Sequence, residues 1–218
     1  MIPLAEDLES ARAYRQRVRQ TLNKVRRLGV RGTLKSLARR VLPEHIEWRL
    51  YARANGTGID APKGPTMRQN EWSDLLKFRP IEPWQNKSQF LAEARERMDR
   101  GERVFTHADD KGLLHYGWFA PQQTSSLFSE VQQRYEYPPG TAVQYDFYTD
   151  PDARGQGFYR SNLVQMLRQA AADPNIKQIY ISVRADNGAS RHVIEGVGFE
   201  YQTSLFRQKR NRARTTAR

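Results

Sequence analysis

The sequence predicts an α/β or α+β domain in which helices pack on the faces of a central sheet. Apolar residues alternate or recur at helical spacing in the order helix, strand hairpin, strand, helix, strand, helix, strand. Turn-forming Gly, Pro and Asp residues separate these segments. A strongly basic N-terminal arm, also helical by its apolar spacing, precedes the domain.

The positive charge of the chain is confined to its two ends. The 218 residues carry 36 Lys and Arg against 24 Asp and Glu, a net charge of +12. Eleven of the basic residues lie in 10–43 and six in 204–218, and neither segment contains an acidic residue. The rest of the chain has a net charge of −5, so the charge describes the termini and not the predicted domain.

The composition divides the chain into four parts. We assign 1–60 to the basic helical arm, 61–71 to a linker, 72–206 to the domain and 207–218 to a basic tail. The helix is predicted from six apolar residues at helical spacing: Leu22, Val25, Leu28, Leu34, Leu37 and Val41. Such a helix can bind anionic lipid, a partner or a phosphate backbone, or it can pack its apolar stripe on the neighbouring domain.

The chain contains no Cys, which excludes disulfides, thiolate metal sites and a catalytic thiol. No segment reaches the roughly 20 apolar residues that a membrane-spanning helix needs. His, Asp and Glu show no metal-ligand spacing, so we expect no metal. We expect a cytoplasmic protein, with attachment to the inner membrane face through 10–43 as an extension of that expectation.

The first half of the domain should contain one helix and a hairpin. Residues 55–66 hold three Gly and two Pro and predict a linker. An amphipathic helix is expected over 88–100, with Ser88 as its N-cap. Strands follow at 104–107 and 113–119, joined by an Asp-Asp-Lys-Gly turn.

The second half should alternate strands and helices. A strand is expected at 142–149 and another at 179–183, with a helix between them that Asp173-Pro174 ends. The core face of that helix is predicted from four apolar residues: Leu163, Met166, Leu167 and Ala170. Asn187 should cap a short helix that ends at Gly198, before a last strand from Phe199 to Leu205.

The most informative segment runs from Tyr145 to Gly157 and predicts a strand, a tight glycine turn and a helix start. Glycines let the backbone approach a ligand, and free amides at a helix N-terminus attract anions such as pyrophosphate. The alternative is a turn without a ligand. Arg160 replaces the third glycine of a dinucleotide fingerprint, and no Gly-Lys-Ser/Thr follows for a P-loop.

Two motifs in this region resemble those of the GCN5-related N-acetyltransferases (GNAT superfamily). Asp150-Pro151 with Arg154-Gly155-x-Gly157 is similar to the family's acetyl-coenzyme A signature. The second motif comprises Asn187, Ser190 and Gly198-Phe199. The resemblance covers about 72–206 and implies a mixed, mostly antiparallel sheet flanked by helices.

The resemblance also implies the binding of acetyl-CoA, or another acyl-CoA, as co-substrate. The strand before the glycine turn should carry a bulge and splay from its neighbour, and the amide of Phe147 should stabilise the oxyanion. The other residues implied to hold the co-substrate are Tyr148, Thr149, Arg154, Gly155, Gln156, Gly157, Phe158, Tyr159 and Asn187.

The sequence departs from the family pattern at two positions. Tyr159 stands where the family usually has Gly or Ala, and Ile194 stands where it often has a general-acid Tyr. We expect Ser190, Tyr159, Tyr201 or a water to replace that acid, with Ser190 as the catalytic candidate. A catalytically weak platform with the same fold is the alternative.

For the general base we expect Asp146 first and His115 second. Asp146 lies between Tyr145 and Phe147, whose rings would partly desolvate it. The alternatives are an Asp that is solvated or paired with Arg, and a structural His.

Together these features predict acyl transfer to an amine of a small metabolite, a sugar or a peptide. Aromatic residues ahead of the glycine turn would suit a sugar or an apolar acceptor, or form core. The alternative function is a membrane-surface or nucleic-acid-binding module that uses the basic ends. We favour membrane over nucleic acid because apolar residues recur within the basic run.

Overall fold

The computed structural model describes residues 46–207 except 57, 62 and 82–84. A compact unit begins at Ile46. The predicted arm helix, with all of 10–43, and residues 208–218 of the predicted tail lie outside the described residues. No helix in the described part of the chain is long and apolar enough to cross a bilayer.

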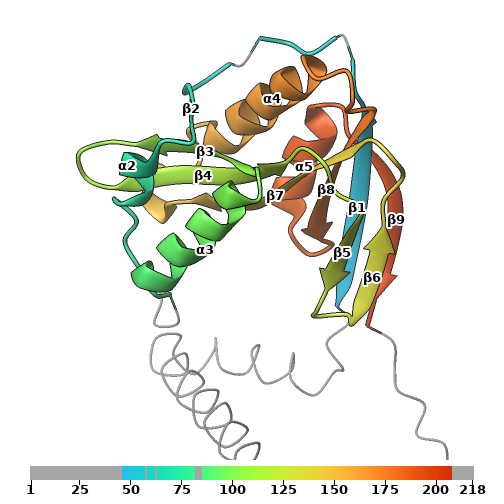
Figure 1. Cartoon of the computed structure of the whole chain (residues 1–218), viewed down its shortest axis with the longest axis horizontal. Helices are drawn as coiled ribbons and strands as arrows, with labels where there is room; N and C mark the ends of the chain where they lie inside the picture. Colours follow the sequence, from blue (N-terminus) through green and yellow to red (C-terminus); the bar gives the residue numbers. More distant parts are fainter. Residues whose placement is uncertain (1–45, 57, 62, 82–84, 208–218) are drawn as a thin grey trace, which may run out of the picture. The chain divides into compact units, whose positions relative to one another are not determined.

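A seven-stranded sheet organises this unit (Figure 1). In spatial order its strands are β2 (Arg68–Gln69), β3 (Arg103–Ala108), β4 (Leu113–Ala120), β7 (Thr141–Thr149), β8 (Gln178–Arg184), β1 (Glu47–Ala54) and β9 (Glu200–Phe206). All neighbouring pairs are antiparallel except β7 and β8, which run parallel. The predicted mixed, mostly antiparallel sheet is therefore confirmed.

The two faces of the sheet are covered differently (Figure 1). Helices α4 (Phe158–Ala171) and α5 (Gly188–Gly196) build one core cluster on the first face. On the other face, α2 (Trp72–Leu75) and α3 (Lys87–Asp99) cover β3 and β4. A separate hairpin of β5 (Ser125–Phe128) and β6 (Gln133–Glu136) packs near β1 and β8 on that face.

The apolar stripe of α4 forms the core as its spacing predicts. Leu163, Met166, Leu167 and Ala170 are at most 1% exposed, and they pack against Ile179 and neighbouring strand residues. Full burial of one such large apolar side chain stabilises the fold by about 1.5–3 kcal/mol. The cap of α3 differs from the prediction, because Asn86 Oδ1 accepts from the amides of Ser88 and Gln89 at 2.9 and 3.2 Å.

The assignment of 1–60 to the N-terminal arm was wrong from residue 47 onward. Glu47–Ala54 forms β1, which lies inside the sheet between β8 and β9. Leu50 and Tyr51 are fully buried on opposite faces of this strand, in two different core clusters. The strand is hard to recognise in the sequence because it carries Arg49 and Arg53. Arg49 donates to Glu47, and Arg53 donates to the carbonyl of Val197.

The predicted linker at 55–66 and 61–71 does not separate two domains. It connects β1 to β2 across α4 and includes β2 itself (Figure 1). Ser161 Oγ donates to the Pro65 carbonyl at 2.7 Å, and the Met67 amide donates to Gln165 Oε1 at 3.1 Å. These bonds make the segment part of the domain, although its Gly and Pro content is typical of linkers.

Candidate active site

A bulge in β7 shapes the centre of the molecule. Tyr116 pairs with Tyr148 and Trp118 with Tyr145, so two residues of β7, Asp146 and Phe147, lie opposite one residue of β4. Asp146 has a φ of 49°, an uncommon value for a residue other than glycine. The bulge predicted in this strand is present, and Phe147 has no ladder partner on either side.

The parallel strands β7 and β8 separate beyond the bulge. They pair only through 141–144 and 178–181, after which β7 pairs with β4 alone and β8 with β1 alone. The divergence opens a cleft with a volume of about 1690 Å³. The splay inferred from the family resemblance is therefore observed.

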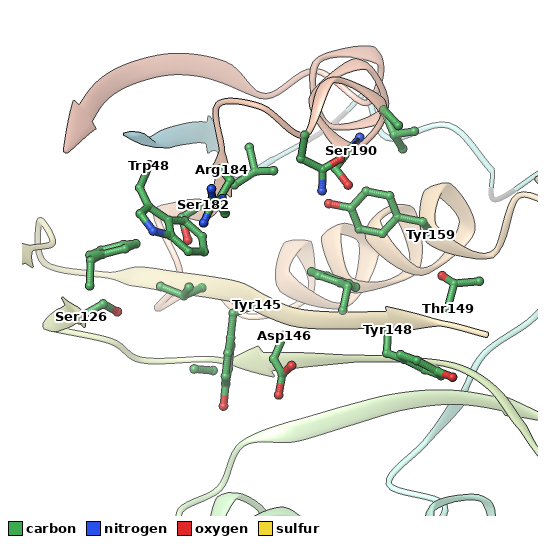
Figure 2. Close-up of a pocket in the computed structure, with 18 of the residues that line it drawn as sticks. Trp48, Ser126, Tyr145, Asp146, Tyr148, Thr149, Tyr159, Ser182, Arg184 and Ser190 are labelled. Carbon is green, nitrogen blue, oxygen red and sulfur yellow. Dashed lines mark hydrogen bonds between the residues drawn. The ribbon is translucent and has the colours of Figure 1, made fainter. Parts of the chain in front are cut away.

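The cleft runs along β7 from the helix N-termini to the hairpin (Figure 2). Tyr159 and Ser190 line one end, and Trp48 and Arg184 line the other. Eleven of the predicted site residues line it: Asp146, Phe147, Tyr148, Thr149, Arg154, Gly155, Gly157, Phe158, Tyr159, Asn187 and Ser190. Gln156 and His115 do not.

The glycine turn presents backbone donors to the cleft. Gly155 and Gly157 have φ values of 80° and 81°, a region that favours glycine. Gly157 is the N-cap of α4 and no side chain caps the helix, which leaves first-turn amides available to a ligand. With Arg154 and Arg160 in the lining, this donor set fits a pyrophosphate. Phe158 can contribute only its backbone, since its ring is buried in the core.

Asp146 forms an ion pair on the α3 side of the cleft. Arg97 Nη1 lies 2.5 Å from Asp146 Oδ2, and the Asp146 side chain remains 40% exposed. The guanidinium of Arg97 also lies over the rings of Trp118 and Tyr145, at 5.0 and 5.2 Å. Pairing with an arginine was one of the alternatives predicted for Asp146. The arginine is Arg97 of α3, which lies 49 residues away in the sequence.

A second pair of groups extends this polar floor. The hydroxyl of Tyr145 donates to Glu102, which also pairs with Arg100 at 2.9 Å. Burial, and then the bond to Glu102, raises the pKa of Tyr145 well above its ordinary value. Nothing in the local sequence marks Arg97, Arg100 or Glu102, because their approach to β7 depends on how α3 docks on the sheet.

His115 is a structural residue and not a base at the cleft. It is fully buried, its Nδ1 lies 2.8 Å from Thr149 Oγ1, and its Nε2 lies 3.0 Å from Asn162 Nδ2. Burial lowers the pKa of His115 to about 3. The expectation of His115 as a second candidate base is wrong, because the imidazole points between β4 and α4. Its bond to Thr149 instead orients a residue that lines the cleft.

The start of α5 also borders the cleft. Asn187 is the N-cap as predicted, and its Oδ1 accepts from the amide of Ser190 at 3.1 Å. Both residues line the cleft. Ile194, at the position of the family's usual tyrosine, is fully buried in the core formed with α4.

The far end of the cleft contains residues that the sequence analysis did not single out. Trp48 of β1 donates from Nε1 to Glu130 Oε2 at 3.1 Å, and Arg184 Nη1 approaches the same oxygen at 3.2 Å. Phe128 of the hairpin packs on Trp48 with ring centroids 5.6 Å apart. The aromatic content of 119–139 was the available signal, but Trp48 lay in the assigned arm.

No three His, Asp or Glu side chains among the described residues converge as ligands of a metal ion. The site is instead built from backbone amides, arginines, carboxylates and aromatic rings. Such a set can bind a phosphorylated co-substrate at one end and a small polar molecule at the other.

Two solved structures are similar to this chain. The structure of an acetyltransferase of the GNAT family from Colwellia psychrerythraea is similar, with 16% identity, 75% of this chain and 56% of that chain covered, and a TM-score of 0.52. A GCN5-related N-acetyltransferase from Sphaerobacter thermophilus has 11% identity, with 80% and 54% covered and a TM-score of 0.49. The chain spans little more than half the length of these two structures. No curated protein matches it.

The likeness to the Colwellia structure concerns the fold alone, while a sequence-family comparison covers more than half of the chain. Residues 67–200 match the acetyltransferase (GNAT) domain model. This range contains the bulge, the glycine turn and the start of α5, the three features that frame the cleft. The chain therefore belongs to the GNAT acetyltransferase family that its two motifs predicted.

Proposed function

We propose that the protein is an acyl-CoA-dependent N-acyltransferase that transfers acetyl from acetyl-CoA to the amine of a small molecule. One observation carries the proposal: the β7 bulge, the β7–β8 splay and the glycine turn all open into the same cleft. Each feature alone is common, but together they offer donors for a thioester and for a pyrophosphate.

The co-substrate would be held mainly by the backbone. The amides at the start of α4, with Arg154 beside them, would bind the pyrophosphate. The stretch from Phe147 to Thr149, which β8 leaves unpaired, would hydrogen-bond the pantetheine arm. Acetyl-CoA supplies an acyl group already activated as a thioester, so a chain without Cys needs no covalent intermediate.

The amide of Phe147 is our candidate for the oxyanion donor. It lies in the bulge, where a residue has no partner in the strand ladder, and it borders the cleft. A fixed donor of this kind stabilises developing negative charge without reorganising in the transition state.

Asp146 is our candidate for the group that accepts the proton of the attacking amine, directly or through a water. It is the next residue to Phe147, and its carboxylate is partly exposed and held by Arg97. Since His115 is buried between β4 and α4, Asp146 is our one candidate for the base.

The acceptor would enter between α3 and the hairpin. Its half of the cleft offers aromatic surfaces from Trp48, Phe128 and Tyr145, and hydroxyls from Ser126 and Ser182. Carboxylates there face arginines of opposite charge, as Glu130 faces Arg184 and Glu102 faces Arg100. A nearly neutral, partly aromatic groove suits a small polar amine such as an amino sugar.

The test is calorimetric titration with acetyl-CoA, followed by release of free thiol with a panel of amines. Because the protein has no Cys, a thiol-reactive dye reports only coenzyme A. We expect binding that weakens for Gly157→Ala, since alanine is strained at a φ of 81°. Absence of binding by the wild-type protein would reject the proposal.

We also propose that the basic ends, 10–43 and the tail from 207, hold the enzyme at an anionic surface, with membrane preferred over nucleic acid. The support is the separation of charge, because the sequence outside the two basic runs is net negative.

A further inference from the structure

We propose that Tyr159 replaces the tyrosine that is absent at position 194 and donates a hydrogen bond to the thiolate that leaves during acyl transfer. The inference rests on the proposed function. It links the two departures of this chain from the family pattern, since position 194, which lacks the phenol, is buried in the core, and position 159, which has gained one, lines the cleft.

The other candidates for this role are less well placed. Ile194 is apolar and fully buried. Tyr201 is 54% exposed on β9, its hydroxyl bonds Ser204 at 2.9 Å, and it does not line the cleft. Ser190 lines the cleft, but its short side chain starts on α5, across the opening from Asp146 and Tyr148 of β7 (Figure 2).

Tyr159 reaches toward the reacting end of the cleft. Its ring lies edge-on to the ring of Phe147, with centroids 5.0 Å apart and planes at 72°. Phe147 also carries the proposed oxyanion donor, so the ring of Tyr159 packs against the side chain of that residue. Figure 2 shows the phenolic oxygen of Tyr159 on the side of Ser190, and both residues line the cleft.

Tyr159 is partly buried, and its hydroxyl makes no hydrogen bond to another described residue. It is not an enclosed, unsatisfied donor, because it is open to the cleft and can bond to water or to a ligand there. Rigid packing on Phe147 and a free donor aimed at a ligand cleft are together the mark of a group reserved for the ligand.

The chemistry favours a hydrogen-bond donor and not a proton donor. Burial raises the pKa of Tyr159 above its ordinary value, whereas an ordinary thiol has a pKa of about 8.5. Complete transfer of the phenolic proton to sulfur would therefore be uphill. A hydrogen bond from the neutral phenol stabilises the thiolate without that transfer.

The amine nitrogen forms a bond to the acyl carbon, the carbon–sulfur bond breaks, and its electron pair stays on sulfur. Tyr159 donates its hydrogen bond to that sulfur and keeps its proton. Asp146 or solvent receives the proton of the amine, and the thiolate takes a proton from solvent.

The test is Tyr159→Phe, which keeps the ring and removes only the donor. We expect kcat to fall about 10–100-fold, while the Kd for acetyl-CoA changes less than about threefold. A second readout is independent of turnover. The thiol pKa of bound coenzyme A should rise by about one unit in the variant, because a lost hydrogen bond to the thiolate disfavours the anion.

That pKa is measured from the ultraviolet absorbance of the thiolate, with the complex of S-methyl coenzyme A as blank. The coenzyme carries the only thiol in the sample. Tyr201→Phe is the matched control and should leave both readouts unchanged, since it lies outside the cleft.

Wild-type kcat and thiol pKa in Tyr159→Phe would overturn the inference while leaving the proposed function standing. Tighter acetyl-CoA binding and faster turnover in Tyr159→Gly would also overturn it, because the ring would then be an obstruction. If the wild-type protein binds no acetyl-CoA, the proposed function fails first and this inference falls with it.

Discussion

The imidazole of His115 shows how one buried side chain ties the fold to pH. Both ring nitrogens lie within 3.0 Å of polar side chains, Thr149 and Asn162, in a site that excludes water. The Asn162 amide nitrogen is a donor to the Phe105 carbonyl, so the imidazole nitrogen facing it serves as acceptor, and the ring is neutral.

We therefore expect acid to destabilise the fold through His115. In the unfolded chain its pKa is near 6.5, whereas burial lowers it to about 3 in the folded protein. As pH falls from 6.5, the unfolded state takes up a proton that the folded state cannot, which costs about 2 kcal/mol by pH 5. Urea unfolding at several pH values measures this loss.

The matched variant is His115→Gln, which removes the titrating ring. Its free energy of unfolding should fall less steeply between pH 6.5 and 5 than that of the wild type, whatever its absolute value. If the free energy of unfolding fell equally steeply with pH in both proteins, the imidazole would not be the group that causes the loss of stability.

Asp146→Asn tests the proposed base. The amide keeps the size of the side chain but cannot accept the amine proton, so kcat/KM for the acceptor should fall about 100-fold. The Kd for acetyl-CoA should not change. Asp152→Asn is the control, because Asp152 is exposed in the turn before α4 and does not line the cleft. If the Asp146→Asn variant kept full activity, Asp146 would not be the base, and solvent would accept the proton of the amine.

At this scale the sequence predicts best what the backbone does locally. Gly157 and Asn187 were placed correctly because a glycine turn and an N-cap are defined within a few residues. Arg97 and Trp48 were missed, and His115 was misplaced, because their surroundings come from elements far apart in the sequence.

The β7 bulge is an element whose shape depends on the strand beside it. Gly117 lies opposite the bulge, and a Cβ at this position would meet the Phe147 ring at 2.3 Å. The ring of Phe147 thus occupies the space that a side chain at position 117 of β4 would fill. The bulge and the glycine are one arrangement shared by two strands.

Gly117→Ala should accordingly lower the free energy of unfolding by about 1–3 kcal/mol and displace Phe147. Acetyl-CoA affinity and kcat should fall further than stability alone explains, as measured by calorimetry and thiol release on fully folded protein. Gly188→Ala is the control, because its Cβ would meet only Arg191 Nη2, at 3.9 Å. If the folded Gly117→Ala variant kept full activity, the shape of the bulge would not matter for function.

Among the elements, β3, β4, β7, β8, α4 and α5 follow from periodicity and turn residues. The hairpin of β5 and β6 and the four-residue α2 are too short to show a period. β1 was missed for a different reason: one of its faces is apolar, but the other carries Glu47, Arg49 and Arg53 around Tyr51. Its partners also lie more than 120 residues away.

For the whole molecule, the compact unit that begins at Ile46 and the basic segment before it should have separable roles. A variant without residues 1–45 should bind acetyl-CoA as the full chain does. It should lose most of its binding to phosphatidylserine vesicles, and the full chain should bind less at higher salt.

Co-sedimentation with vesicles and titration with duplex DNA, each at two salt concentrations, measure this difference. Neutral phosphatidylcholine vesicles are the control. If the full and shortened chains bound vesicles equally, the basic segment would not be what binds the anionic surface.

The position of β1 in the sheet also determines when the sheet can form during synthesis. It is the first strand of the sheet to be synthesised, yet it lies between β8 and β9, which are the last two. On the ribosome this strand has no partner until nearly the whole domain has emerged. Folding must then close contacts of long sequence separation, which is slow. The sheet is completed only after β9 has been synthesised, and until then the strand bearing Leu50 and Tyr51 offers a chaperone an exposed apolar segment.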